Sequence, residues 1–180
     1  MADVKQTIAD FYTQAQAKDF ARTNLFRVLS INFGNGTPLF GETDLVYART
    51  AELPAKSITN VTAPYMGLVF NVPGVVQYPG SDSYTMNFYS DESQDLREKF
   101  LGIVTNTFDD ATSTGNYFMP KQTAVIDLVQ LDKTLTKVAQ YQLVGASIRN
   151  VGPLAYDITG TGEIQTFDVG VAYHYWRKTG

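Results

Sequence analysis

The feature that most constrains this chain is a stretch of alternating character near its C-terminus, GEIQTFDVGVAYHYW, from Gly162 to Trp176. Every second residue from Phe167 to Tyr175 is apolar or aromatic, and the residues between them are small or polar. Such alternation is typical of a β-strand with one apolar face. Most strands have roughly 5–6 residues, whereas this stretch predicts one more than twice as long, spanning about 40 Å. A strand that outreaches the core of a small domain indicates a sheet that continues from one subunit into the next.

The composition is that of one folded domain without cysteine chemistry. The 180 residues are 44% hydrophobic, which is enough to bury a core, so we expect a single domain over 1–180. The absence of cysteine excludes disulfides, thiolate metal sites and cysteine nucleophiles. A net charge of −4 makes the chain a poor candidate for binding nucleic acid, because binding to phosphate groups needs positive charge. No apolar run predicts a membrane span or a secretion signal, so we expect a cytoplasmic protein or one that leaves by another route.

The order of periodic segments predicts a mainly β protein. Apolar residues at helix spacing predict a short N-terminal helix over residues 3–17. From Asn24 the period changes to two, which places Leu25, Leu29, Ile31 and Phe33 on one face before a turn at GNGTPLFG. Residues 54–65 have no sustained period and a proline near each end, so we expect a long loop, and such loops are usually functional. Further strands are predicted within 44–53, 66–72, 83–90, 123–131 and 136–146.

One helix in the middle of the chain is clearly marked. Asp91 is a good N-cap, and Gln94 stands three residues later, where it completes a capping box. Leu96, Phe100, Ile103 and Val104 form one apolar stripe. We therefore predict an antiparallel β-sandwich or partly closed barrel, with a flanking helix at about 91–107 and a short N-terminal helix.

No constellation of catalytic residues is evident, and we expect no enzymatic activity, no cofactor and no metal. The only histidine, His174, lies on the polar side of the last predicted strand, where it is a possible base or an ordinary contact residue. Asp109 and Asp110 form a possible cation pair, but they lie in a Ser/Thr-rich stretch that reads as a solvated loop. No phosphate-binding glycine motif or metalloprotease motif is present.

Several segments of the chain resemble the tail tube proteins of contractile-tailed bacteriophages, in order and near the expected spacing. They are DFARTNLFRV (19–28), AELPA (51–55), NFYSDESQDLREKF (87–100), NVG (150–152) and EIQTFDVGVAYHYW (163–176). The resemblance covers about residues 19–176. The sequence departs from the family pattern at 34–44 and at 146–149, which affects the expected loop geometry.

This resemblance implies a structural protein that assembles with copies of itself. Members of the family form hexameric rings, which stack into a hollow tube inside a contractile sheath, and DNA passes through the tube. The implied partners are the sheath, baseplate and tail terminator proteins, together with double-stranded DNA that is not specifically bound. The implied location is the virion tail, assembled in the host cytoplasm. Two alternatives stay open: a tube subunit of a type VI or bacteriocin-like system, or a monomeric β-barrel module that binds an apolar ligand.

Three sets of residues are candidates for assembly contacts. The loop at 54–65 is predicted to connect stacked rings, as the loop after the AELPA-like segment does in the family, with the 1–19 arm as the next candidate. Its candidate residues are Pro54, Ser57, Ile58, Val61 and Tyr65. The candidates for lateral contact between subunits are Tyr173, Tyr175 and Trp176. The candidates for the lumen wall are Thr166 and Asp168, on the polar side of the last strand.

Overall fold

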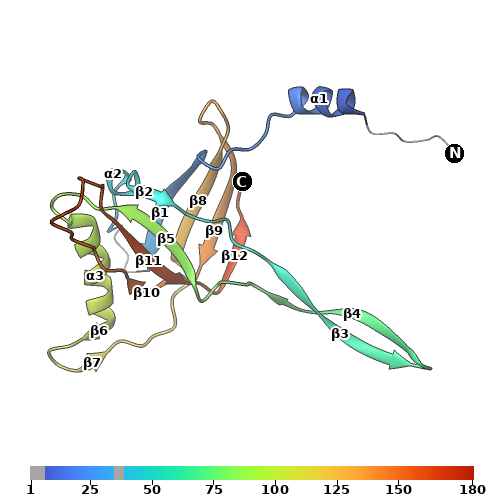
Figure 1. The fold of residues 1–180 in the computed structure, drawn as a ribbon. Helices are drawn as coiled ribbons and strands as arrows, with labels where there is room; N and C mark the ends of the chain where they lie inside the picture. Colours follow the sequence, from blue (N-terminus) through green and yellow to red (C-terminus); the bar gives the residue numbers. More distant parts are fainter. Residues whose placement is uncertain (1–6, 35–38) are drawn as a thin grey trace.

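Two antiparallel four-stranded sheets form the body of the molecule (Figure 1). The structure is a computed structural model and describes residues 7–34 and 39–180. The first sheet has the strand order β1 (Phe26–Phe33), β8 (Ala124–Leu131), β9 (Lys137–Val144) and β12 (Tyr175–Lys178). The second has the order β10 (Ser147–Val151), β11 (Thr166–Ala172), β5 (Tyr84–Tyr89) and β2 (Ala48–Thr50).

The remaining elements are three helices and two separate strand pairs. The helices are α1 (Ile8–Ala17), α2 (Glu42–Leu45) and α3 (Asp95–Thr107). The strand pairs are β3 (Ser57–Tyr65) with β4 (Leu68–Gln77), and β6 (Phe108–Asp109) with β7 (Thr114–Gly115). The prediction of a mainly β protein with antiparallel sheets and a few helices is confirmed. No closed barrel is found among the residues that the structure describes.

The two sheets and α3 share one apolar core. Their buried side chains form a single cluster, which also includes Phe40 and Leu45. The Phe100 ring of α3 lies 4.5 Å from Phe40, 5.2 Å from Phe88 and 6.2 Å from Phe167, measured between ring centroids. Tilted and edge-on aromatic contacts of this kind add to the stability that apolar burial gives. Phe100 therefore joins the helix to the sheets, together with the buried side chains of Leu96 and Ile103.

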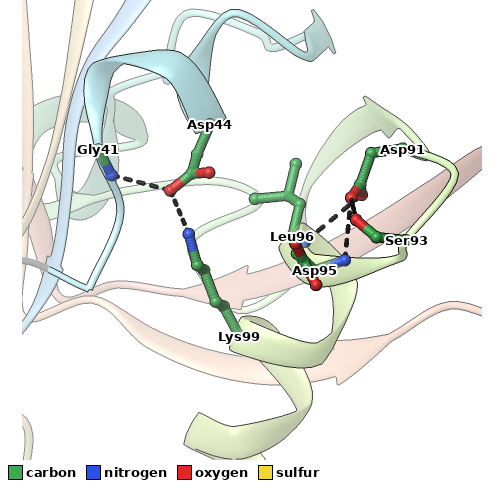
Figure 2. A network of polar contacts seen from close by, with 7 residues as sticks. All are labelled: Gly41, Asp44, Asp91, Ser93, Asp95, Leu96 and Lys99. Carbon is green, nitrogen blue, oxygen red and sulfur yellow. Dashed lines mark hydrogen bonds and ion pairs between the residues drawn. The ribbon is translucent and has the colours of Figure 1, made fainter.

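The first turn of α3 is capped by Asp91, although the helix begins later than the capping pattern predicts. Figure 2 shows the Asp91 carboxylate accepting hydrogen bonds from the backbone N–H groups of Asp95 and Leu96, at 3.0 and 3.4 Å, and from the Ser93 hydroxyl. Gln94 is the residue that precedes the helix, and its side chain donates to the Tyr156 hydroxyl. The helix thus spans Asp95–Thr107, and the predicted capping box with Gln94 is wrong because that side chain has another partner.

A second contact in Figure 2 joins α3 to α2. The Lys99 ammonium lies 2.6 Å from the Asp44 carboxylate, which also accepts from the backbone N–H of Gly41. Partial burial by itself raises the pKa of Asp44, but the hydrogen bonds from Lys99 and Gly41 outweigh it, so the pKa is lowered. The ion pair therefore fixes the position of α2 against the helix.

Acid is expected to weaken the α3 cap. The hydrogen bond from Ser93, with those from the backbone, lowers the pKa of Asp91 below its ordinary value of 3.8. A carboxylate whose pKa is lower in the folded protein stabilises the fold at pH values above its ordinary pKa. This stabilisation is lost as the pH falls through the pKa of the folded protein. Asp91→Ala should lower the free energy of unfolding by about 0.5–2 kcal/mol at neutral pH.

Asp91→Asn is the matched variant, because asparagine caps a helix but does not titrate. Urea unfolding at neutral pH and at about pH 3 should give a smaller acid-induced loss for Asp91→Asn than for the unmodified protein. An equal loss in both proteins would contradict the assignment of acid sensitivity to this carboxylate.

The C-terminal stretch does not form one strand, which corrects the expectation from its alternation. β11 pairs with β10 and β5 in the second sheet, whereas β12 pairs with β9 in the first. Between them, the backbone N–H of Tyr173 donates to the Ser81 carbonyl at 2.8 Å, and that of His174 donates to the Val144 carbonyl at 2.9 Å. Gly145, at φ +71°, leaves the space that the His174 ring occupies. These contacts carry the chain from one sheet to the other.

This change of sheet also interrupts the alternation of faces. The odd-numbered residues of 167–173 are buried, as a period of two predicts. The next residue against the core is Trp176, three positions later, rather than Tyr175. Tyr175 pairs with Val144 on the other face of the first sheet.

A bulge in β1 overturns part of the predicted face. The pairing of β1 with β8 shifts register between Val28 and Ser30. Val28 and Ile31, three positions apart, are both buried, whereas Leu29 is exposed. An extra residue in one strand shifts the alternation by one, so a strict period of two assigns Leu29 to the wrong face.

The segment predicted as a long loop is instead a strand. Residues 57–65 form β3, which pairs antiparallel with β4 from Ser57–Gln77 to Tyr65–Leu68, with a shift in register between Ile58 and Asn60. The resulting hairpin projects away from the body (Figure 1). The sequence shows no alternation of apolar and polar residues here because both faces of β3 are exposed beyond its root. Such a strand does not need one apolar and one polar face.

Two smaller differences concern the N-terminal third of the chain. The predicted helix over 3–17 is observed as Ile8–Ala17, and its residues 3–6 lie outside the described part. Part of the turn predicted at GNGTPLFG also lies outside it, at 35–38. The strand predicted within 44–53 is observed as the three residues of β2, and the start of that range belongs to the short helix α2.

Candidate assembly surfaces

The hairpin of β3 and β4 carries no charged residue. From Ser57 to Gln77 the chain has no Asp, Glu, Lys or Arg, although these residues make up 18% of the protein. Exposed strand edges are usually protected by charges, especially lysine, against pairing with other chains. An isolated two-stranded ribbon is also only marginally stable in water. Both properties are unusual for a hairpin that is surrounded only by water.

Its large apolar side chains are exposed along the whole length. The exposed fraction runs from 42% at Val76 to 85% at Met66. The residues concerned are Ile58, Val61, Tyr65, Met66, Leu68, Val69, Phe70, Val72, Val75 and Val76. Continuous apolar surface of this kind marks a site of contact with a protein or a membrane.

The turn at the tip of the hairpin contains an unusual residue. Met66 has φ 49° and Gly67 has φ 80°, so both central residues adopt the left-handed conformation. Hairpin turns of this type favour Asn, Asp or Gly at the first position. A residue with a Cβ atom there costs about 1–2 kcal/mol. The geometry of the turn gives no reason for a methionine at position 66. Strained backbone of this kind is often found at functional sites.

The root of the hairpin is attached to the body through Trp176. The indole N–H of Trp176 donates to the Ala55 carbonyl at 2.8 Å, and the ring packs edge-on against Tyr141 at 5.8 Å. The predicted inter-ring residues divide between root and ribbon: Pro54 and Ser57 are half-buried at the root, whereas Ile58, Val61 and Tyr65 are exposed on the ribbon.

The three aromatic residues predicted for lateral contact have different surroundings. Tyr173 is only 5% exposed and packs edge-on against Tyr84 at 5.8 Å, so it supports the core and offers little surface. Tyr175 and Trp176 are half-buried on β12. Because β12 is an edge strand of the first sheet, these two residues lie where a neighbouring chain could pair.

The two lumen candidates lie together on the outward face of the second sheet. Thr166 and Asp168 alternate along β11 with the buried residues Phe167 and Val169. The Asp168 carboxylate accepts a hydrogen bond from the Asn87 side chain at 2.7 Å, across the strand pair of β11 and β5. This part of the face therefore presents hydroxyl, amide and carboxylate groups.

A small, mainly apolar groove lies on the body beside the segment that leads into β3. Its volume is 240 Å³, and Leu25, Phe26, Leu53 and Leu128 line it, with Arg22 and Glu52. The Tyr84 hydroxyl donates to the Glu52 carbonyl at 2.6 Å, which anchors the lining segment. Sequence reasoning missed this groove because three segments far apart in the chain form it.

The α1 arm exposes an apolar surface of its own. Thr7 and Asp10 form a capping box at its start, and none of its residues is buried. Ile8, Phe11 and Tyr12 are each more than half exposed. The linker after the helix contacts the β8–β9 turn through the ion pair between Asp19 and Lys133, at 3.3 Å.

The residues considered for catalysis or metal binding take structural positions. The Asp109 carboxylate accepts from the Thr112 hydroxyl and the backbone N–H of Ala111, which lowers its pKa and stabilises its own turn. His174 is exposed beside Gly145. Within residues 7–34 and 39–180, no cluster of three or more His, Cys, Asp or Glu side chains could hold a metal ion. None of the described helices is long and apolar enough to cross a membrane.

Comparison with curated proteins finds two relatives that match most of the chain. The chain is 30% identical over 165 residues to the tail tube protein gp19 of Enterobacteria phage T4, which covers 89% of this chain and 93% of that protein. The match to the tail tube protein gp19 of Enterobacteria phage T6 has the same identity and the same coverage. No protein-family model matches the chain.

The same fold is found in solved structures of the anti-feeding prophage and of an extracellular contractile injection system. One is the tube terminating cap of the anti-feeding prophage, with a TM-score of 0.62, 12% identity and coverage of 99% of each chain. Another is a chain of the anti-feeding prophage baseplate, with a TM-score of 0.63, 13% identity and coverage of 91% of this chain and 97% of that one. A third is in the PVC sheath–tube complex, with a TM-score of 0.56, 10% identity and coverage of 97% and 99%.

Proposed function

Because this chain belongs to the phage tail tube protein family, we propose that it is the repeating subunit of a hollow tube built from stacked hexameric rings. The tube lies inside a contractile sheath in the virion tail. Its relatives are structural tail proteins and not enzymes, so its function is mechanical. The partners that follow from this role are the sheath, the baseplate and the tail terminator.

The strongest support for this proposal is the hairpin of β3 and β4, which has no charged residue. A ribbon of 57–77 with exposed apolar side chains and no charge is poorly suited to water. In a stack of rings, the hairpin lies against a subunit of the adjacent ring, which buries its apolar side chains. The inter-ring residues Pro54, Ser57, Ile58, Val61 and Tyr65 then act as parts of a hairpin rather than of a loop.

Ring closure in this proposal uses the free edges of the sheets. β12 carries Tyr175 and Trp176 at one edge of the first sheet, and β10 and β2 are the edges of the second. Joining such edges around a ring makes the sheets continuous between subunits and removes edges that would otherwise promote aggregation.

The lumen in this proposal is lined by the outward face of the second sheet, including Thr166 and Asp168. On this wall the negative charge of Asp168 is matched by the positive charge of Arg49, whose guanidinium lies 5.8 Å from the centre of the Tyr89 ring on the same face. A neutral or acidic wall does not attract phosphate, so double-stranded DNA can pass without being held.

A tube subunit of a type VI or bacteriocin-like system is the neighbouring alternative, and the 30% identity to two phage proteins favours the phage tail. The groove gives the apolar-ligand module little support, because its 240 Å³ is below the roughly 300–1,000 Å³ typical of small-molecule sites.

Size-exclusion chromatography and negative-stain microscopy of the purified protein test the proposal directly. Rings with sixfold symmetry, alone or stacked into tubes, are the expected result. A protein that stays monomeric at every concentration and salt condition tried would overturn it.

Trp176→Ala is expected to weaken the rings. Truncating an interfacial tryptophan commonly costs about 2 kcal/mol or more, so the concentration needed for rings should rise by more than about tenfold. Trp176→Phe is the control, since it keeps a smaller aromatic ring beside Tyr141 and removes the hydrogen bond to Ala55. Light scattering after size exclusion measures both. Intact Trp176→Ala rings at low micromolar concentration would count against this lateral contact.

A further inference from the structure

We infer that the hairpin tip, with Met66 at its end, docks into the groove formed by Leu25, Leu53 and Leu128 on a neighbouring copy of this chain. The inference rests on the proposed function, because it supplies the acceptor surface for the hairpin between stacked rings.

The tip is suited to insertion into a small apolar site. Met66 is 85% exposed and stands at the end of the ribbon, flanked by Tyr65 and Leu68, which are also mostly exposed. The left-handed backbone of Met66 and Gly67 directs the chain through a tight turn. Methionine is unbranched and adaptable, so it fills irregular apolar spaces well.

The groove is suited to receive one such side chain. The apolar residues that line its 240 Å³ are Leu25, Phe26, Ala51, Leu53, Leu128 and Val129. Leu53 is 51% exposed at its surface, whereas Leu128 is buried. Arg22 and Glu52 supply charged groups to the same lining. These groups can pair with the backbone N–H and C=O groups that an uncharged turn presents.

The occupant must come from another molecule. The groove includes Ala51, Glu52 and Leu53, which precede the root of the hairpin, whereas Met66 is at its far end. The nine residues of β3 separate the two by about 30 Å of extended ribbon, so the tip does not reach its own root. Figure 1 shows the ribbon running outward from the body.

A tip-in-groove contact is head-to-tail. Each copy carries one tip and one groove on different parts of its surface, so every bound copy leaves a tip free at one end and a groove free at the other. Contacts of this heterologous kind repeat without closing unless rotation brings the ends together. The geometry therefore gives the tube a polarity and lets it lengthen by addition of further rings.

Met66→Asn provides a sharp test, because it should improve the turn and remove the anchor. Asparagine followed by glycine is the favoured pair in this turn, so the hairpin and body should remain folded. We expect rings to persist, but the concentration needed for tubes should rise by about tenfold or more. Negative-stain tube lengths measure this. Tubes of unchanged length and concentration dependence would overturn the inference.

Disulfide trapping identifies the surface that the tip meets, and the chain has no native cysteine to interfere. Under mild oxidation, the double variant Met66→Cys/Leu53→Cys should form a ladder of dimers, trimers and larger species on a denaturing gel. Separately prepared Met66→Cys and Leu53→Cys chains should give only heterodimers when mixed, and each alone should give none. The mixture of the two single-cysteine chains tests the same contact if the double variant assembles poorly.

The matched control places the first cysteine on the other exposed apolar arm, as Phe11→Cys/Leu53→Cys. Cross-linking of that pair in place of the Met66 pair would show that α1 occupies the groove, and would overturn the inference. Tubes that form without the Met66 cross-link would overturn it while leaving the proposed function intact. Absence of rings and tubes in the unmodified protein would instead remove the proposed function, and the inference with it.

Discussion

Replacing the hairpin Ser57–Gln77 by a short Gly/Ser linker is expected to abolish tubes and leave the body folded. Ser57 and Gln77 are paired at the root, so a short linker joins the cut ends without strain. No hairpin residue belongs to the core cluster, so the sheets lose no buried contact. The protein should elute as single rings or monomers, and no tubes should be visible by negative stain at any concentration.

A milder variant separates loss of the hairpin from loss of its surface. Val69→Lys leaves the ribbon in place and introduces one charge into an uncharged stretch, where Val69 is 64% exposed. Burying an unpaired charge at an interface is costly, so stacking should weaken while the monomer's stability changes little.

Tubes of normal length from the excised protein would show that another surface connects the rings, and α1 would be the next candidate.

Phe100→Ala is expected to have the largest effect on the stability of the body. Phe100 is fully buried and its ring contacts those of Phe40, Phe88 and Phe167. Truncating a buried phenylalanine costs about 3–5 kcal/mol, because apolar contact is lost and a cavity remains. Whole domains are stable by only about 5–15 kcal/mol, so much of the variant should be unfolded near physiological temperature.

The measurement is best made on the hairpin-excised protein, since assembly adds to apparent stability by mass action. Urea unfolding followed by circular dichroism should show a large fall in the midpoint for Phe100→Ala. Val104→Ala is the control: Val104 is the next residue of the same apolar stripe but is 38% exposed, so the change should be small. Similar losses for both variants would contradict the central position given to the Phe100 ring.

Much of the fold was predictable because local patterns and burial agree. The stripe of Leu96, Phe100 and Ile103 predicted α3, and all three side chains are buried. The alternation of 167–173 predicted β11, since one face of that strand lies against the core. Asp91 was identified as the capping residue because it stands before an apolar stripe, although the helix starts four residues after it.

The ends and pairings of the strands were less predictable. The pattern of 162–176 has no mark at Tyr173 and His174, where backbone hydrogen bonds to Ser81 and Val144 move the chain to the other sheet. The bulge at Val28 and Ser30 is equally unmarked. Both depend on partners from distant parts of the chain, which local periodicity does not contain.

The amino-acid sequence alone was enough to predict the mainly β class, the helix at the middle of the chain and, through resemblance over residues 19–176, membership of a tube-forming family. The projecting hairpin of residues 57–77 and the groove beside its root became evident from the folded chain, because sequence patterns report burial within one chain. A ribbon with both faces exposed leaves no such pattern, and a groove built from three distant segments exists only after they are packed together.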